Sequence, residues 1–162
     1  DAENLEFPDE SFDFVWSWGV IHHSSHTEKI VQQIKRVLRP GGRAKVMVYH
    51  RNWWNYYVAS ALLRGIIQGQ LFKGMSLHEI LQGSTDGAIA RFYSIDEWKK
   101  LISPHLTVED VEIHGPKTDL VLIPASPFKD VLLKATPNGL SRLLTHRGRL
   151  GTFLVSTIHK DA

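Results

Sequence analysis

The chain has 162 residues, of which 43% are hydrophobic and 22% are charged, and its formal net charge is +2. The hydrophobic fraction, together with five Trp, seven Phe and four Tyr, excludes an intrinsically disordered chain. Cysteine is absent, which excludes disulfides and thiolate metal sites. The apolar runs are all far shorter than the roughly 20 residues of a membrane-spanning helix. We therefore expect one folded domain of a cytoplasmic protein without a transmembrane segment.

The first regular elements are two strands with a helix between them. Residues 12–18 are aromatic and β-branched on both sides, which predicts a strand buried on both faces with Trp16 in the core. Apolar residues at helical spacing predict an amphipathic helix over 27–39. An apolar run predicts a second buried strand over 44–49. Strand, helix and strand in this order predict a right-handed βαβ unit.

Two capping boxes mark helix starts. In this pattern a Ser side chain accepts a hydrogen bond from the N–H three residues on, and the Glu at that position reaches back. Ser25 with Glu28 predicts such a start for the first helix. Ser94 with Glu97 predicts one for a later helix that ends before Pro104.

The remaining elements follow from local pattern in the same way. Residues 53–67 are a helix candidate that is apolar nearly all round, with Asn52 as its cap, and a short helix is expected over 77–81. Three further strands are expected over 107–114, 120–123 and 152–159. Between the last two strands we expect a linker with two short helical pieces.

Four short segments carry the clearest functional signal. In chain order they are Asp1–Pro8, Ser11–Val15, Gly19–His23 and Arg36–Gly42. In this order and spacing they resemble the class I S-adenosylmethionine-dependent methyltransferases, in particular the type 11 methyltransferases. The resemblance implies an α/β fold: the carboxyl-terminal part of a Rossmann-like three-layer sandwich, with a mostly parallel sheet, an antiparallel last strand and a helical lid insert.

The resemblance also implies a domain organisation. Residues 1–162 would form a single incomplete methyltransferase domain, in which 1–50 and 94–160 carry the core, 51–93 form the lid over the substrate, and 124–150 are a second insert before the last strand. The family's Gly-rich cofactor turn is missing, since Gly-x-Gly occurs nowhere in the sequence. We expect that turn in an upstream segment, and we expect the fragment alone to be inactive.

The family's cofactor is S-adenosylmethionine, and the resemblance implies its contacts. Asp1 would accept a hydrogen bond from the adenine amine, and the backbone N–H of Ala2 would meet a ring nitrogen. Trp18 and His22 would lie beside the sulfonium, because aromatic faces favour a cation and open parallel sheets bind ligands at the carboxyl ends of their strands. The expected cofactor contacts are Asp1, Ala2, Glu3, Ser17, Trp18, Gly19 and His22.

Three histidines, His22, His23 and His26, lie close together in the sequence. Neutral imidazoles are common zinc ligands, but no spaced carboxylate or cysteine completes a ligand set, so no metal is expected. Methyl transfer needs positioning of the two reactants, and it needs a base only where the acceptor carries a proton that must leave. His22 and His23 are the candidate catalytic residues for that role.

The methyl acceptor is expected to be small or lipophilic, because the aromatic residues of the insert would wall such a molecule. The expected substrate contacts are His50, Trp54, Tyr57, Arg91 and Tyr93. For Arg91 the alternative is a structural arginine. For the helix over 53–67 the alternatives are a buried position under the lid and a membrane surface, and its sparse Lys and Arg argue against the membrane.

Other functions stay open beside methyl transfer. The chain is also compatible with a non-catalytic, partner-binding module derived from a methyltransferase fold. The basic stretch 129–149 would be a solvated face or a phosphate-binding patch. With 19 basic against 17 acidic residues, no nucleic-acid partner is expected. The acceptor atom and the oligomeric state are not predicted, although an exposed sheet edge in this chain would promote association.

Overall fold

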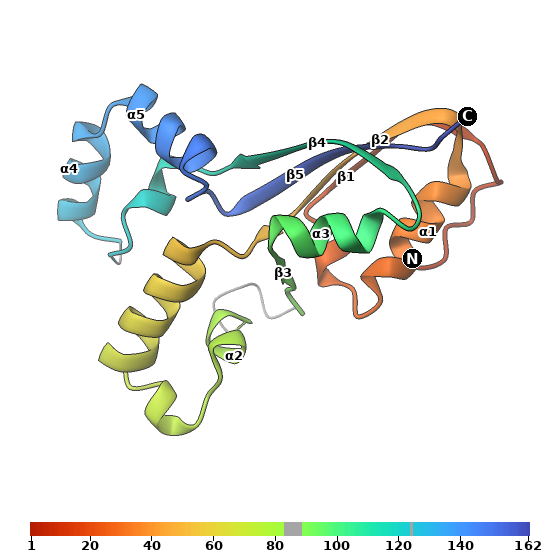
Figure 1. The fold of residues 1–162 in the computed structure, drawn as a ribbon. Helices are drawn as coiled ribbons and strands as arrows, with labels where there is room; N and C mark the ends of the chain where they lie inside the picture. Colours follow the sequence, from red (N-terminus) through yellow and green to blue (C-terminus); the bar gives the residue numbers. More distant parts are fainter. Residues whose placement is uncertain (83–88, 124) are drawn as a thin grey trace. The chain divides into compact units, whose positions relative to one another are not determined.

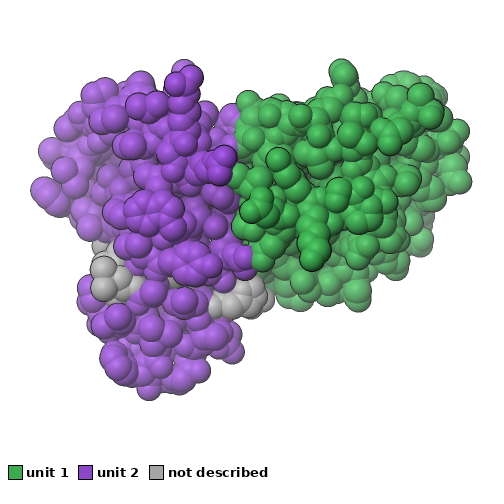
Figure 2. Space-filling model, viewed as in Figure 1, with its two compact units in different colours: residues 1–49, 89–112, 154–162 green, residues 50–88, 113–153 purple. Residues whose placement is uncertain are grey.

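A computed structural model of the chain describes residues 1–82, 89–123 and 125–162 (Figure 1). The described chain divides into two compact units (Figure 2). The first consists of residues 1–49, 89–112 and 154–162, and the second of residues 50–88 and 113–153. Residues 83–88 and 124 of the two predicted inserts lie outside the described residues. The predicted organisation of 1–162 as a single domain stays a prediction.

The strands form one sheet in the order β1-β2-β5-β4, and β3 pairs with β2 outside this path. The bounds are Phe12–Trp18 for β1, Leu38–His50 for β2, Phe92–Tyr93 for β3, Thr107–His114 for β4 and Phe153–His159 for β5. In this order β1 is an edge strand and the last strand of the chain lies in the interior of the sheet. The predicted strands over 107–114 and 152–159 are therefore confirmed to within a residue.

The βαβ unit is confirmed, since β1 and β2 pair in parallel and helix α1, Thr27–Val37, connects them. The α/β fold class is confirmed as well, but the strand pairing differs in one detail from the expected mostly parallel sheet. Hydrogen bonds join Lys160 to Gly42 and His50 to Thr152, so β5 runs antiparallel to β2. Along this path β1–β2 is parallel and β2–β5 is antiparallel, with β5 lying between β2 and β4.

Helices α1 and α3 form the helical layer of the first unit. Helix α3 covers Ile95–Ile102, and it contacts α1 on the same side of the sheet (Figure 1). Both helices bury a stripe of apolar side chains, as their periodicity predicts. At the centre, the fully buried indole N–H of Trp98 donates to Ser156 Oγ at 3.0 Å, so both of these buried polar groups are satisfied.

Strand β1 contradicts the expectation of burial on both faces. Trp16, predicted in the core, is 58% exposed, and Trp18 is 43% exposed. Their rings stack with centroids 5.2 Å apart, and Phe14 extends the same exposed row. The reason is the position of β1 at the sheet edge, where no described helix of the first unit covers this face.

One of the two predicted capping boxes and one predicted strand are absent from the structure. The Ser94–Glu97 capping box is confirmed in full. The box at Ser25 is wrong, since α1 begins after His26 without a side-chain cap, and Glu28 instead contacts His105. The strand expected over 120–123 is also wrong, because a short 3₁₀ helix, η4 at Lys117–Leu120, turns the chain there.

The second unit is mostly helical. Residues Trp53–Ile67 form η2, a helix with π-type hydrogen bonds, and Asn52 caps it as predicted by accepting from the Asn55 N–H at 2.6 Å. The other helices are η3 Leu71–Lys73, α2 Leu77–Gln82, α4 Pro127–Ala135, α5 Asn138–Arg142 and η5 Leu143–Arg147. Among the described residues, no helix combines the length and the hydropathy needed to cross a bilayer.

Candidate functional site

The carboxyl end of β1 carries three of the predicted cofactor contacts. Trp18 is the last residue of the strand, Ser17 precedes it, and Gly19 follows with a φ of +71°. A side chain at this φ is strained, so glycine is the residue that lets the chain leave the strand here. The Gly19 N–H donates to Met47 O on β2 at 3.4 Å. The turn is thus fixed to the neighbouring strand, with the Trp18 ring left partly exposed beside it.

The turn leads into η1, Ile21–His23, which carries the two predicted catalytic histidines. His22 is fully buried. Its ring lies 4.0 Å from the ring of Tyr49 and 4.2 Å from that of His23, measured between centroids. His22 is therefore shielded from solvent and packs against the rings of His23 and Tyr49.

His23 is half-buried, and its Nδ1 lies 2.8 Å from the main-chain oxygen of Ile89. A carbonyl oxygen only accepts hydrogen bonds, so Nδ1 must carry the proton. In the neutral ring Nε2 then holds the lone pair. Of the two histidines, His23 is the one whose ring is partly exposed and whose tautomer is fixed by a hydrogen bond to a main-chain oxygen.

The first loop of the chain is tied to the loop that follows η1. The carboxylate of Glu3 accepts from Ser24 Oγ at 2.5 Å and lies 3.1 Å from His26 Nδ1. The Ser24 hydrogen bond is the largest cause that lowers the pKa of Glu3. Asp1 Oδ1 accepts from the Glu3 N–H at 2.9 Å, which orders the turn that also contains Ala2. The first loop, which carries three predicted cofactor contacts, is thereby tied to the loop that follows η1 in the first unit.

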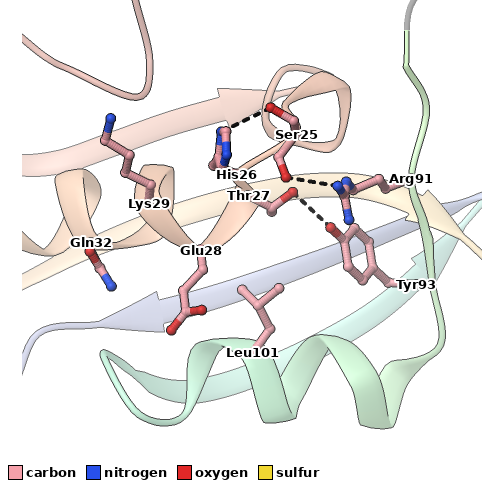
Figure 3. Close-up of a pocket in the computed structure, with 9 residues that line it drawn as sticks. All are labelled: Ser25, His26, Thr27, Glu28, Lys29, Gln32, Arg91, Tyr93 and Leu101. Atoms are coloured by element: carbon pink, nitrogen blue, oxygen red, sulfur yellow. Dashed lines mark hydrogen bonds between the residues drawn. The ribbon is translucent and has the colours of Figure 1, made fainter.

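Arg91 and Tyr93, predicted as substrate contacts, line a polar pocket of about 480 Å³ at the start of α1 (Figure 3). Arg91 donates to the main-chain oxygens of Ser24 at 3.1 Å and Ser25 at 2.8 Å. The Tyr93 hydroxyl donates to Thr27 Oγ1 at 2.9 Å, and burial is the main cause that raises its pKa. The side chains that line this pocket are those of Ser25, His26, Thr27, Glu28, Lys29, Gln32, Arg91, Tyr93 and Leu101.

The other three predicted substrate contacts lie in the second unit. His50 is buried, and its Nδ1 donates to Gly151 O at 2.9 Å. Burial lowers the pKa of His50, so its ring is held neutral. Trp54 is half-buried and Tyr57 is exposed on η2. None of these three residues is among those that line the cavity of about 580 Å³ in this unit.

The sequence reasoning missed a buried polar cluster next to His50. Asp119 is 9% exposed, and its Oδ2 accepts from the N–H and the hydroxyl of Thr152 at 3.0 and 2.9 Å. Burial is the largest cause that raises the pKa of Asp119. Asn55 Nδ2 donates to Asp119 O at 3.2 Å. No local pattern singles out Asp119, because its partners come from two distant segments. Among the described residues, no three His, Asp or Glu side chains lie close enough together to hold a metal ion.

Comparison with known proteins agrees with this geometry. Residues 1–46 match the family described as a methyltransferase domain. The 27-O-demethylrifamycin SV methyltransferase of Amycolatopsis mediterranei is 49% identical over 43 residues, which are 26% of this chain and 16% of that protein. The ubiquinone/menaquinone biosynthesis C-methyltransferase of Burkholderia mallei is 36% identical over 53 residues, which are 33% of this chain and 22% of that protein.

The structural match covers more of the chain than the sequence matches do. An S-adenosylmethionine-dependent methyltransferase from Mesorhizobium loti superposes with a TM-score of 0.59 at 16% identity, covering 99% of this chain and 67% of that structure. The aligned segments span only 16% and 22% of the two curated relatives. The matched segment in the first unit includes β1, η1, α1 and most of β2, where the predicted cofactor contacts and both candidate catalytic histidines lie.

Proposed function

We propose that this chain is a class I S-adenosylmethionine-dependent methyltransferase, which transfers a methyl group from S-adenosylmethionine to a small or lipophilic acceptor. The observation that carries the proposal is the family match over residues 1–46. It covers the carboxyl end of β1, the turn at Gly19 and the loop with His22 and His23. Ligands of open parallel sheets bind at this end of the strands.

The residues at the end of β1 fit the cofactor. S-adenosylmethionine, when bound, supplies an electrophilic methyl group on a sulfonium. The partly exposed indole face of Trp18 and the carbonyls of the Ser17–Gly19 turn favour a cation. The exposed carboxylate of Asp1 fits the adenine amine, with the Ala2 N–H beside it. Glu3 would act by positioning, since its carboxylate already accepts from Ser24.

His23 would serve as the general base. Its Nδ1 donates to Ile89 O, so Nε2 is the nitrogen that accepts the acceptor's hydroxyl or amine proton. The carbonyl fixes both the tautomer and the plane of the ring, which keeps Nε2 in one orientation. His22, buried beside it, would support this ring by packing.

The acceptor would bind near the pocket at the start of α1. Arg91 closes one wall by holding the Ser24 and Ser25 carbonyls, and Tyr93 closes another through Thr27. Both side chains then act mainly by fixing the loop that carries His23. His50, Trp54 and Tyr57 remain proposed acceptor contacts of the second unit.

Calorimetric titration with S-adenosylmethionine and with S-adenosylhomocysteine tests the proposal. We expect saturable heat from both ligands and a weakened affinity in Trp18→Ala. Trp16→Ala is the matched control, because it removes the same exposed ring from the same strand two residues away from the site. Because the Gly-rich turn is expected in an upstream segment, the titration uses this chain joined to that segment. If this folded protein gives no heat with either ligand, the proposal fails and the alternative of a non-catalytic binding module gains support.

A further inference from the structure

Helix α4, in the second unit, has a stripe of apolar side chains that is exposed to solvent. None of its nine residues is buried. Phe128 is 64% exposed and Val131 61% exposed, and Leu132 is exposed beside them. These three residues are spaced i, i+3 and i+4, so they lie on one side of the helix. Two further leucines of the following helices, Leu140 and Leu143, are also exposed and spaced three apart.

Polar tethers hold α4 in place without using this stripe. The Lys117 ammonium donates to the main-chain oxygens of Leu133 at 3.0 Å and Thr136 at 2.6 Å, at the carboxyl end of the helix. Lys129 donates to Ile123 O at 3.0 Å, and Ser126 caps the amino end. The helix is thus attached through its backbone ends and its cations, and the apolar side chains stay free to contact a partner.

Cations accompany the exposed apolar residues. Lys134, Arg142, Arg147 and Arg149 are all exposed. No ion pair joins any of these four to another residue of the described chain. Asp130 is the one carboxylate in the sequence from 126 to 149. The second unit as a whole has nine Lys and Arg against four Asp and Glu, whereas the first has ten against 13, so the positive charge gathers in one unit.

We propose that the segment 127–149, with α4, α5 and η5 (Figure 1), binds the surface of an anionic lipid bilayer. Exposed Phe and Leu beside Lys and Arg fit the boundary between acyl chains and negatively charged headgroups, because the apolar side chains leave water while the cations meet lipid phosphates. A nucleic acid would satisfy the cations but would leave the stripe of Phe128, Val131 and Leu132 in water. The surface therefore favours lipid, independently of the proposed methyl transfer.

Sedimentation of the full chain with vesicles tests this inference. The probes are vesicles of phosphatidylcholine alone and of phosphatidylcholine with about one-third phosphatidylglycerol. We expect binding to the anionic vesicles that weakens with salt, and little binding to the neutral ones. Phe128→Ser with Leu132→Ser should weaken binding by about tenfold or more. Arg142→Gln with Arg147→Gln should weaken it by about 25-fold, since each cation near an anionic surface contributes about fivefold.

Matched control variants test whether exposed aromatic rings and cations elsewhere in the chain also contribute to vesicle binding. Phe72→Ser removes an 81% exposed ring from η3, and Lys99→Gln with Lys100→Gln removes two exposed cations from α3. Both should leave vesicle binding within about twofold of the unchanged chain, as expected for residues outside the contact. Absent binding to anionic vesicles, equal binding to neutral ones, or equal losses in the controls overturns the proposal. The proposal is also overturned if the chain does not bind vesicles but binds an oligonucleotide, and if that binding requires Arg142 and Arg147 but not Phe128.

Discussion

Nδ1 of His23 lies 2.8 Å from the main-chain oxygen of Ile89, 66 residues further along the chain. The contact sets which ring nitrogen is protonated, because the carbonyl can only accept. The same segment is held a second time, since the Arg91 N–H donates to His22 O at 2.9 Å. The short β3 region and the η1 loop are thereby joined into one rigid structure. This arrangement provides an imidazole in a fixed tautomer close in sequence to the end of β1.

Replacing His23 with Gln should abolish base catalysis and spare cofactor binding. For an acceptor with a hydroxyl or amine proton, we expect the methyl-transfer rate to fall by about 10²–10⁴-fold. Rates measured with tritiated S-adenosylmethionine check it. His159→Gln, a partly exposed ring at the end of β5, is the control, and an equal loss there would contradict the assignment.

Replacing Tyr93 with Phe should destabilise the first unit modestly. The Tyr93 hydroxyl donates to Thr27 Oγ1, and Thr27 is itself buried at the start of α1. Loss of one such hydrogen bond costs about 1 kcal/mol in the free energy of unfolding. Urea denaturation measures this cost. Tyr57→Phe removes an exposed hydroxyl from η2 and should change the unfolding midpoint little; a larger effect at Tyr57 would argue against the structural role of Tyr93.

His50 should make the protein less stable in mild acid. Burial lowers the pKa of His50 below its ordinary value of 6.5, so the unfolded chain takes up a proton that the folded chain refuses. The stability contributed by the neutral ring is present above pH 6.5 and is lost as pH falls through the lowered pKa. Urea midpoints measured from neutral pH downward should fall less steeply in His50→Gln. The exposed His26→Gln should keep the original slope, and identical slopes for all three proteins would refute the prediction.

The exposed row on β1 should drive self-association of this chain. An edge strand presents unpaired main-chain groups, and Phe14, Trp16 and Trp18 add apolar surface to it. We expect the elution volume in gel filtration to shift with concentration, and Trp16→Lys to suppress that shift. Trp53→Lys places the same charge on an exposed ring of η2 and should not suppress it. A monomer at every concentration would show that the edge is protected in solution.

The sequence was sufficient where the determinants are local. The capping box at Ser94 and Glu97, the Asn52 cap of η2 and the stripe of α1 each depend on residues within a few positions of one another. The alternation of strand, helix and strand also predicted the parallel pair β1–β2. Local hydrogen-bond geometry and periodicity are properties of short segments, so these elements could be predicted before any contact was known.

The predictions that were wrong, and the site residue that was missed, depend on contacts with residues far away in the sequence. Whether Trp16 is buried depends on which strands and helices lie beside β1, and the row of residues 12–18 carries no information on that. Glu28 bonds with His105 instead of completing a capping box, across 77 residues. Asp119 is buried because Thr152, 33 residues away, supplies two donors. In each case the contacts made in the folded protein determined the burial or hydrogen bonding of the residue, and the local sequence pattern did not.

Photochemical crosslinking with methyl-labelled S-adenosylmethionine, followed by trypsin digestion and peptide mapping, tests the central claim most directly. The first Lys or Arg of the sequence is Lys29, so one tryptic peptide ends there and contains every proposed cofactor contact from Asp1 to His22, together with His23. We predict that the label is found in this peptide, that excess S-adenosylhomocysteine prevents labelling, and that Trp18→Ala reduces it more than Trp16→Ala does. Label confined to peptides after Lys29, or labelling that S-adenosylhomocysteine does not prevent, would contradict a cofactor site at the carboxyl end of β1.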